Sequence, residues 1–224
     1  MGVVDLHHDV VDADAVADRP DRRIVDDRFA VMGWSAGGQY ALATAVGRVD
    51  RVTRAAVIAG CLPLDDPGVF DQLDQLDRRL VTWSTRRPVL ARSYFRASRQ
   101  LAERAPRRLT KISAGQLEGR DRGSLAALGE WFPQVMAEGV VDLHGAVDDY
   151  LAYAAPWGFR PEDVDVPVDL YQGTDDALVP KAWADVLHER IPQSTLEVID
   201  GGGHLIAVSC RREVMQRLRS PAGH

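Results

Sequence analysis

Four short apolar runs alternate with helical stretches along this chain, and their order is the strongest constraint on its fold. The runs are rich in Val, Ile, Leu and Ala, which is typical of strands buried on both faces of a parallel sheet. The candidate strands are 29–33, 55–60, 166–171 and 195–199. Helical patterns follow three of them, at 40–46, 180–191 and 205–219. Strand, helix and strand in this order form a right-handed βαβ unit, so the sequence predicts an α/β fold around a mostly parallel sheet.

The middle of the chain has a different pattern of apolar residues. From about residue 65 to 160, Pro, Gly and Trp interrupt a series of amphipathic helical stretches, and no strand-like run appears. We therefore predict two parts. Residues 1–64 and 161–224 form an α/β core, and residues 65–160 form an inserted helical cap subdomain.

Composition excludes several classes of protein. The net charge of −6 argues against a nucleic-acid-binding protein, because such domains carry a basic surplus. The acidic N-terminus has no signal-peptide pattern and no apolar run is long enough to span a bilayer, which favours a cytoplasmic protein without stable membrane association. Cys61 and Cys210 form neither a disulfide framework nor a zinc motif, and we expect no metal and no cofactor.

A candidate nucleophile lies between the first strand and the first helix. Gly33-Trp34-Ser35-Ala36-Gly37 places a serine at a tight turn, a strained conformation that requires neighbours without bulky side chains. Gly33 and Gly37 are the expected elbow glycines, and Gly38 adds room. The Ala36 amide, at the start of the helix, would donate to an oxyanion. The alternative is a glycine-rich turn with no chemistry.

An acid and a base follow in the order that a catalytic triad on this type of fold requires. Two aspartates come directly after the third strand; we favour Asp176 as the acid and keep Asp175 as the alternative, since both could instead cap the next helix. His204 follows the last strand after three glycines, and the other five histidines lie elsewhere. Ser35, Asp176 and His204 are therefore the candidate catalytic residues.

Three segments together resemble the α/β-hydrolase family. They are Gly-Trp-Ser-Ala-Gly-Gly at 33–38, Gly-Thr-Asp-Asp-Ala-Leu-Val-Pro at 173–180 and Gly-Gly-Gly-His at 201–204. The resemblance covers about residues 25–219 and implies a central parallel sheet, a helical cap and cofactor-free ester or amide chemistry. Gln172 departs from the family, in which a His often precedes the glycine, and we expect little effect from this.

The front of the chain departs further from the family. Members of the α/β-hydrolase family usually have about four strands before the nucleophile and an upstream loop with a second oxyanion donor. In this sequence, 34 residues precede Ser35. The first candidate strand would then have an open edge, which predicts a homodimer or aggregation through that edge unless residues 1–23 cover it. Loss of one oxyanion donor predicts weak activity.

The helical segment is strongly basic over part of its length. Residues 78–111 contain eleven basic side chains and one acid, Glu103. Two interpretations stay open: attraction of an anionic substrate or surface, or a solvated face that pairs with the acidic core. Aromatic residues of the segment could line an acyl pocket; these are Trp83, Tyr94, Phe95, Trp131, Phe132 and Trp157.

Together these observations favour a serine hydrolase that cleaves a small carboxylic ester through an acyl-enzyme. An aminopeptidase or a cofactor-free perhydrolase of the same chemistry is the alternative, and only substrate screening separates them. A third hypothesis is a catalytically impaired remnant that binds a ligand or partner.

Overall fold

The computed structural model describes residues 28–117 and 119–219, and its centre is a four-stranded parallel sheet. The strands pair in the order of the chain. They are β1 (Phe29–Trp34), β2 (Val52–Ile58), β3 (Val168–Gly173) and β4 (Ser194–Ile199). This arrangement confirms the predicted α/β fold with a parallel sheet. The expectations for residues 1–23, including His7 and His8, and for His224 lie outside the described residues.

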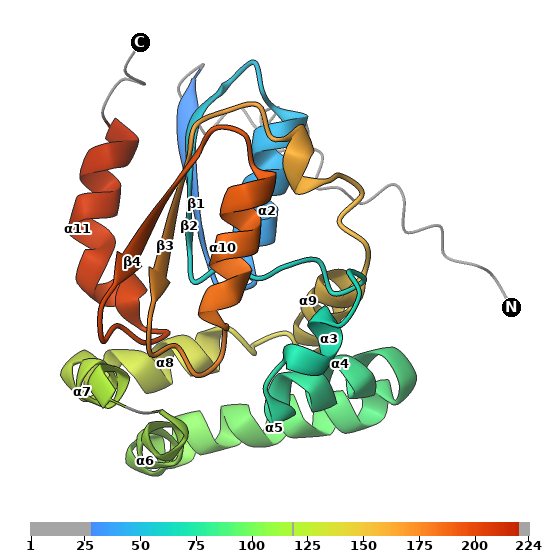
Figure 1. Cartoon of the computed structure of the whole chain (residues 1–224). Coiled ribbons are helices and arrows are strands. Elements are labelled where there is room, and N and C mark those ends of the chain that lie inside the picture. Colours follow the sequence, from blue (N-terminus) through green and yellow to red (C-terminus); the bar gives the residue numbers. More distant parts are fainter. Residues whose placement is uncertain (1–27, 118, 220–224) are drawn as a thin grey trace, which may run out of the picture.

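Three helices cover the two faces of this sheet (Figure 1). They are α2 (Gly37–Gly47), α10 (Lys181–Arg190) and α11 (Ile206–Arg219). Val57 of β2 packs with Leu42 of α2 and Leu187 of α10, whereas its neighbour Ile58 packs with Val214 of α11. Because successive side chains of a strand point to opposite faces, one continuously apolar strand serves both layers.

In the described part of the chain, seven helices connect β2 to β3 and lie across one end of the sheet (Figure 1). They are α3 (Val69–Gln72), α4 (Gln75–Arg86), α5 (Pro88–Arg104), α6 (Pro106–Gln116), α7 (Gly119–Leu128), α8 (Trp131–Glu138) and α9 (Leu143–Ala154), followed by the 3-10 turn η2 (Pro161–Asp163). Helices α4, α5 and α9 share a buried cluster that includes Leu80, Phe95 and Val147. Their role as a cap subdomain stays a prediction.

The second strand differs from its predicted bounds. It begins at Val52 and ends at Ile58, whereas the apolar run indicated 55–60. At its N-terminal end the strand pairs with β1, where Phe29 is opposite Val52. The Arg54 guanidinium there meets the buried carboxylate of Asp169 on β3 at 2.9 Å. At the other end, Ala59 takes a left-handed φ of 48°, so the strand ends at Ile58, two residues before Gly60.

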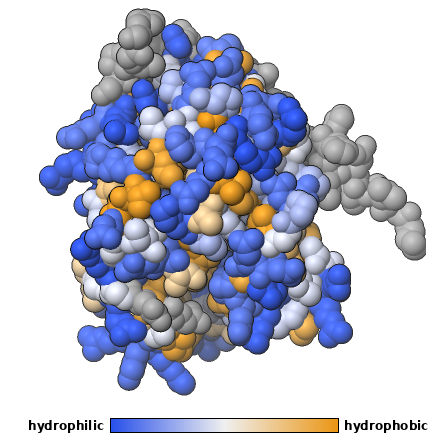
Figure 2. Space-filling model, in the orientation of Figure 1, coloured by the Kyte–Doolittle hydropathy of each residue, from blue (hydrophilic) through white to orange (hydrophobic). Residues whose placement is uncertain are grey.

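β1 is an outer strand of the described sheet, since it pairs with β2 alone there. Met32 of this strand is 45% exposed. Association of two chains through this edge stays a prediction. On the face shown in Figure 2, apolar residues form small groups among hydrophilic ones. Within residues 28–117 and 119–219, no helix is both long and apolar enough to cross a membrane.

The basic segment makes few ion pairs. Of its side chains, Arg99 pairs with Glu103 inside α5, and Arg78 donates to the backbone carbonyls of Asp71 and Leu73. No ion pair from residues 78–111 to the sheet or its flanking helices occurs in the described part of the chain. Both interpretations of this basic face stay predictions.

Candidate active site

Ser35 lies at the turn between β1 and α2, in a conformation that few non-glycine residues adopt. Its φ is 55°, and its backbone is held by the Ser35 N–H, which donates to the Ile58 carbonyl at 2.9 Å, and by the Gly38 N–H, which donates to the Ser35 carbonyl at 2.9 Å. A left-handed L-residue is strained and persists only where the surrounding structure fixes it, so the turn presents this hydroxyl under constraint.

The glycines around Ser35 differ in what they contribute. A Cβ on Gly33 would lie 2.1 Å from the Gly37 carbonyl oxygen, and one on Gly38 would lie 2.8 Å from Val57 Cγ1. A Cβ on Gly37 would meet open space. Gly33 and Gly38 therefore supply the room that the turn needs, and the expectation that Gly37 does so is wrong. Within the described residues, the Ala36 N–H donates to no protein acceptor, which leaves it available for a ligand.

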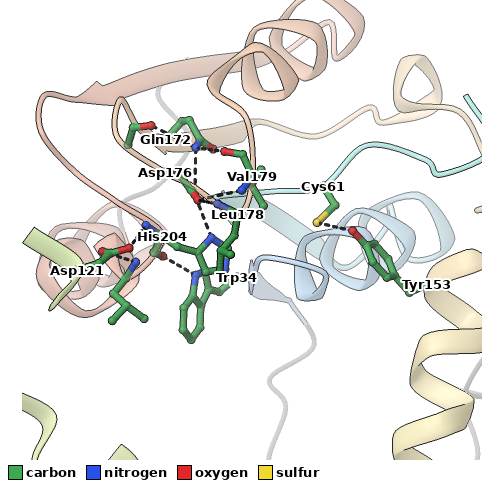
Figure 3. A network of polar contacts seen from close by, with 11 residues as sticks. Trp34, Cys61, Asp121, Tyr153, Gln172, Asp176, Leu178, Val179 and His204 are labelled. Carbon is green, nitrogen blue, oxygen red and sulfur yellow. Dashed lines mark hydrogen bonds and ion pairs between the residues drawn. The ribbon is translucent and has the colours of Figure 1, made fainter. Parts of the chain in front are cut away.

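Asp176 and His204 meet at the ends of β3 and β4 (Figure 3). The imidazole Nδ1 of His204 lies 3.0 Å from Oδ2 of Asp176, whose side chain is fully buried. The other oxygen, Oδ1, accepts the backbone amides of Leu178 and Val179, each at 2.9 Å. These bonds fix the carboxylate. Because Oδ2 of Asp176 is an acceptor, it favours the tautomer in which Nδ1 carries the proton and Nε2 is free to take one.

Asp175, the alternative acid, lies apart from His204. It is exposed, and its Oδ1 accepts the hydroxyl of Thr174 at 2.9 Å. The geometry therefore favours Asp176 over its neighbour.

Gln172 has a larger part than the sequence indicated. Its Nε2 donates to Asp176 Oδ2 at 3.2 Å and to the Val179 carbonyl at 3.1 Å (Figure 3). The side chain is completely buried on β3. It thus ties the carboxylate to the turn that carries it. The expectation that this departure from the family has little effect stays a prediction.

His204 is also held through its backbone (Figure 3). Its N–H donates to Oδ2 of Asp121, and its carbonyl accepts the indole N–H of Trp34 at 2.9 Å. The rings of Trp34 and His204 lie 5.4 Å apart between centroids. The imidazole is therefore connected to β1, which carries the nucleophile turn, and to helix α7.

A buried thiol, Cys61, lies near the nucleophile turn. Burial raises the pKa of Cys61 to about 12, and the nearby hydroxyls of Tyr153 and Ser35 partly offset this rise by lowering the pKa. Tyr153 lies 3.3 Å from that sulfur. Within the described residues, Ser35 Oγ makes no direct hydrogen bond to the imidazole, which is common in ligand-free sites. The thiol stays protonated near neutral pH and is no rival nucleophile.

Two pockets open on either side of Ser35. The first, of about 340 Å³, is bordered by Ser35 and His204 and is otherwise mainly apolar. Its apolar walls are Trp34, Leu117, Leu125, Phe132, Leu178 and Leu205. Of the six aromatic residues predicted to line an acyl pocket, only Phe132 borders this one. Trp83, Tyr94 and Phe95 instead belong to the cluster among α4, α5 and α9, and Trp157 packs against the main core.

The second pocket, of about 330 Å³, is polar and acidic. Ser35, Ala36 and Gly37 form one side, and the rest comes from Tyr40, Asp77, Asp149, Tyr150 and Tyr153. Burial raises the pKa of Asp77 to about 6, although the Tyr150 hydroxyl donates to it at 2.8 Å. Neither carboxylate has an ion pair in the described part of the chain. This pocket therefore suits a group that is neutral or positively charged.

Other candidate ligands lie away from this centre. His188 contacts the Ser194 hydroxyl at 2.9 Å, and His144 is exposed on α9. No group of three or more His, Cys, Asp or Glu side chains suited to a metal occurs among residues 28–117 and 119–219.

Asp121, Trp34 and Cys61 belong to this site, although the sequence did not predict a place for them there. Trp34 was adjacent to the nucleophile, and that proximity was an available signal. Asp121 gave none, since nothing local in its helix indicates a contact with the loop before α11.

Comparison with known proteins agrees with this geometry. The alpha/beta hydrolase family model matches residues 3–217. A protein described as the carbamate hydrolase RutD, from Cronobacter turicensis, is 39% identical over 61 residues, which are 27% of this chain and 21% of that protein.

Solved structures share the fold at low sequence identity. An esterase from Exiguobacterium antarcticum gives a TM-score of 0.52 at 17% identity, over 84% of this chain and 64% of that one. A bromoperoxidase from Bacillus anthracis gives 0.57 at 18% identity, over 85% and 66%. The chain thus spans less than two thirds of the length of either protein.

Proposed function

Because this chain belongs to the alpha/beta hydrolase family, we propose that it is a serine hydrolase that cleaves a small carboxylic ester through an acyl-enzyme intermediate. The proposal depends chiefly on one observation. A strained serine and a histidine that is oriented by a buried carboxylate border the same cavity.

In this mechanism Ser35 Oγ attacks the ester carbonyl carbon while His204 Nε2 takes the hydroxyl proton. Attack requires Oγ to come within hydrogen-bonding reach of the imidazole Nε2. Asp176 orients the ring and stabilises the imidazolium, and the Ala36 amide donates to the oxyanion. The imidazolium then gives its proton to the leaving alcohol. In the second half of the reaction, water attacks the acyl-enzyme while His204 takes its proton, and the carboxylic acid leaves Ser35.

The first pocket offers a place for the leaving group. The departing oxygen must receive its proton from the imidazole, and His204 borders the apolar pocket but not the acidic one. We therefore place an apolar alcohol portion in the first pocket and the acyl portion beside Ala36.

A fluorophosphonate probe tests the proposal directly. We expect one label per chain, on Ser35, with loss of labelling in Ser35→Ala and steady turnover of p-nitrophenyl acetate by the unmodified protein. Folded protein that neither labels nor turns over this ester would contradict the proposal and favour a non-catalytic binding protein.

A second candidate is an aminopeptidase of the same chemistry, and the acidic pocket favours it. Asp77 and Asp149 lie beside Ser35 without a cationic partner in the described residues, and a substrate ammonium group would supply one. Alanine p-nitroanilide and its N-acetyl derivative differ in this charge. Preference for the free amine would support an aminopeptidase, whereas equal or reversed rates would count against it.

A further inference from the structure

Helix α7 contacts the loop that carries His204 at two points. This loop connects β4 to α11, and one of the contacts is at its start, where Arg120 donates to the Asp200 carbonyl at 2.8 Å. The other is at the histidine itself, where the carboxylate of Asp121 accepts the backbone amides of His204 at 2.5 Å and Leu205 at 2.8 Å. A helix that is remote in sequence therefore holds the proposed base.

Asp121 is a buried carboxylate that accepts its hydrogen bonds from this loop. It is 4% exposed, and its two oxygens accept one loop amide each. It has no ion pair in the described part of the chain. Because burial of an unpaired charge is costly, the two amides are the interactions that keep this side chain inside.

The loop is shaped to admit this carboxylate. A Cβ on Gly203 would lie 2.3 Å from Asp121 Cγ, so a side chain at this position would displace it. The histidine is then held at three separate groups: its N–H by Asp121, its carbonyl by Trp34 and its ring by Asp176.

We propose that Asp121 is a positioning residue that aims the His204 imidazole at Ser35 through the backbone of the histidine loop. This inference rests on the proposed function, because it assigns His204 the role of general base. A base displaced by about 1 Å loses on the order of 10²-fold in rate. Helix α7 also contributes Leu125 to the apolar pocket, where it packs against Leu205, so the wall that contacts substrate and the support of the base belong to one helix.

The test compares Asp121→Asn with the unmodified protein. Asparagine keeps the size of the side chain, but its NH₂ group faces one of the two amides, so one loop N–H loses its acceptor. We expect kcat for p-nitrophenyl acetate to fall by on the order of 10²-fold, with KM within about twofold. Asp142→Asn is the matched control, because Asp142 accepts the His144 amide at 2.9 Å in the same helical segment and lies outside both pockets. An unchanged kcat in Asp121→Asn would overturn the inference.

A double-mutant cycle separates positioning from general loss of structure. In His204→Ala, Asp121→Asn should leave the residual rate of fluorophosphonate labelling unchanged, because the group that it positions is absent. An equal loss of rate with and without His204 would show a merely structural role and overturn the inference.

A third measurement does not depend on enzyme activity. It therefore distinguishes failure of the proposed hydrolase function from failure of the proposed positioning role. The Nδ1 proton of His204, identified in ¹⁵N-histidine spectra by its loss in His204→Ala, reports the hydrogen bond to Asp176. We expect it to shift or exchange faster in Asp121→Asn and to stay unchanged in Asp142→Asn. A protein that never labels at Ser35 but shows this response would refute the hydrolase and retain the positioning role; an unaffected proton would refute the positioning role.

Discussion

Replacement of Asp176 by asparagine tests the acid–base pair most sharply. In the structure, Oδ1 accepts two backbone amides, and Oδ2 receives Nδ1 of His204 and Nε2 of Gln172. If the asparagine oxygen stays with the two amides, its NH₂ group faces the imidazole. The ring then exchanges its tautomer, so that Nδ1 accepts and Nε2 carries the proton, and it can no longer act as a base. The corresponding change in a serine protease lowers kcat about 10⁴-fold, and we expect a loss of that order.

The same change has a calculable effect on stability. Gln172 keeps the Val179 and Gly173 carbonyls as acceptors, so the net loss is about one charge-assisted hydrogen bond. We therefore expect the free energy of unfolding in urea to fall by about 1.5–3 kcal/mol. Asp175→Asn is the matched control, since that side chain is exposed and, among the described residues, hydrogen-bonds to Thr174 alone. It should change stability by less than about 0.5 kcal/mol and leave turnover nearly unaltered. If Asp175→Asn abolished turnover while Asp176→Asn retained it, the assignment of the acid would be refuted.

Three further predictions follow from single positions. At Ser35, a left-handed alanine costs about 1–2 kcal/mol and a glycine about 0.5–1 kcal/mol, so Ser35→Gly should be about 0.5–1 kcal/mol more stable in urea than Ser35→Ala; equal stability would show that the turn is unstrained. Gly33→Ala should lower stability by about 1–3 kcal/mol and abolish labelling, whereas Gly37→Ala should be neutral or slightly stabilising; the reverse order in thermal melts would contradict the steric argument. Burial raises the pKa of Asp77 from 3.8 to about 6, so its contribution to stability is present below about pH 4 and is lost as pH rises through 6. Asp77→Asn should therefore exceed the unmodified protein by up to about 3 kcal/mol at pH 8 and match it near pH 4, as measured by urea unfolding at both pH values; a constant difference would count against the raised pKa.

The parts of the site that the sequence predicts share one property. Ser35, Asp176 and His204 each follow a strand, and the carboxyl ends of parallel strands meet at one edge of a sheet, so local pattern and chain order indicated their convergence. The contacts of Asp121 and Trp34 could not be inferred in this way. Both depend on where a helix or an indole ring lies relative to a distant loop, and packing decides this rather than any local periodicity. The ion pair of Arg54 on β2 could not be predicted either, because its partner Asp169 lies on β3, beyond the whole helical segment.

The placement of seven helices between β2 and β3 has a consequence for how this protein is made. Ala55 pairs with Val168, so the central ladder of the sheet cannot close until the ribosome has synthesised everything between them. Ser35 leaves the ribosome well before Asp176 and His204. The hydroxyl therefore stays unassisted while the helical segment is synthesised, and a nascent chain should acquire its chemistry only after β4 has joined the sheet.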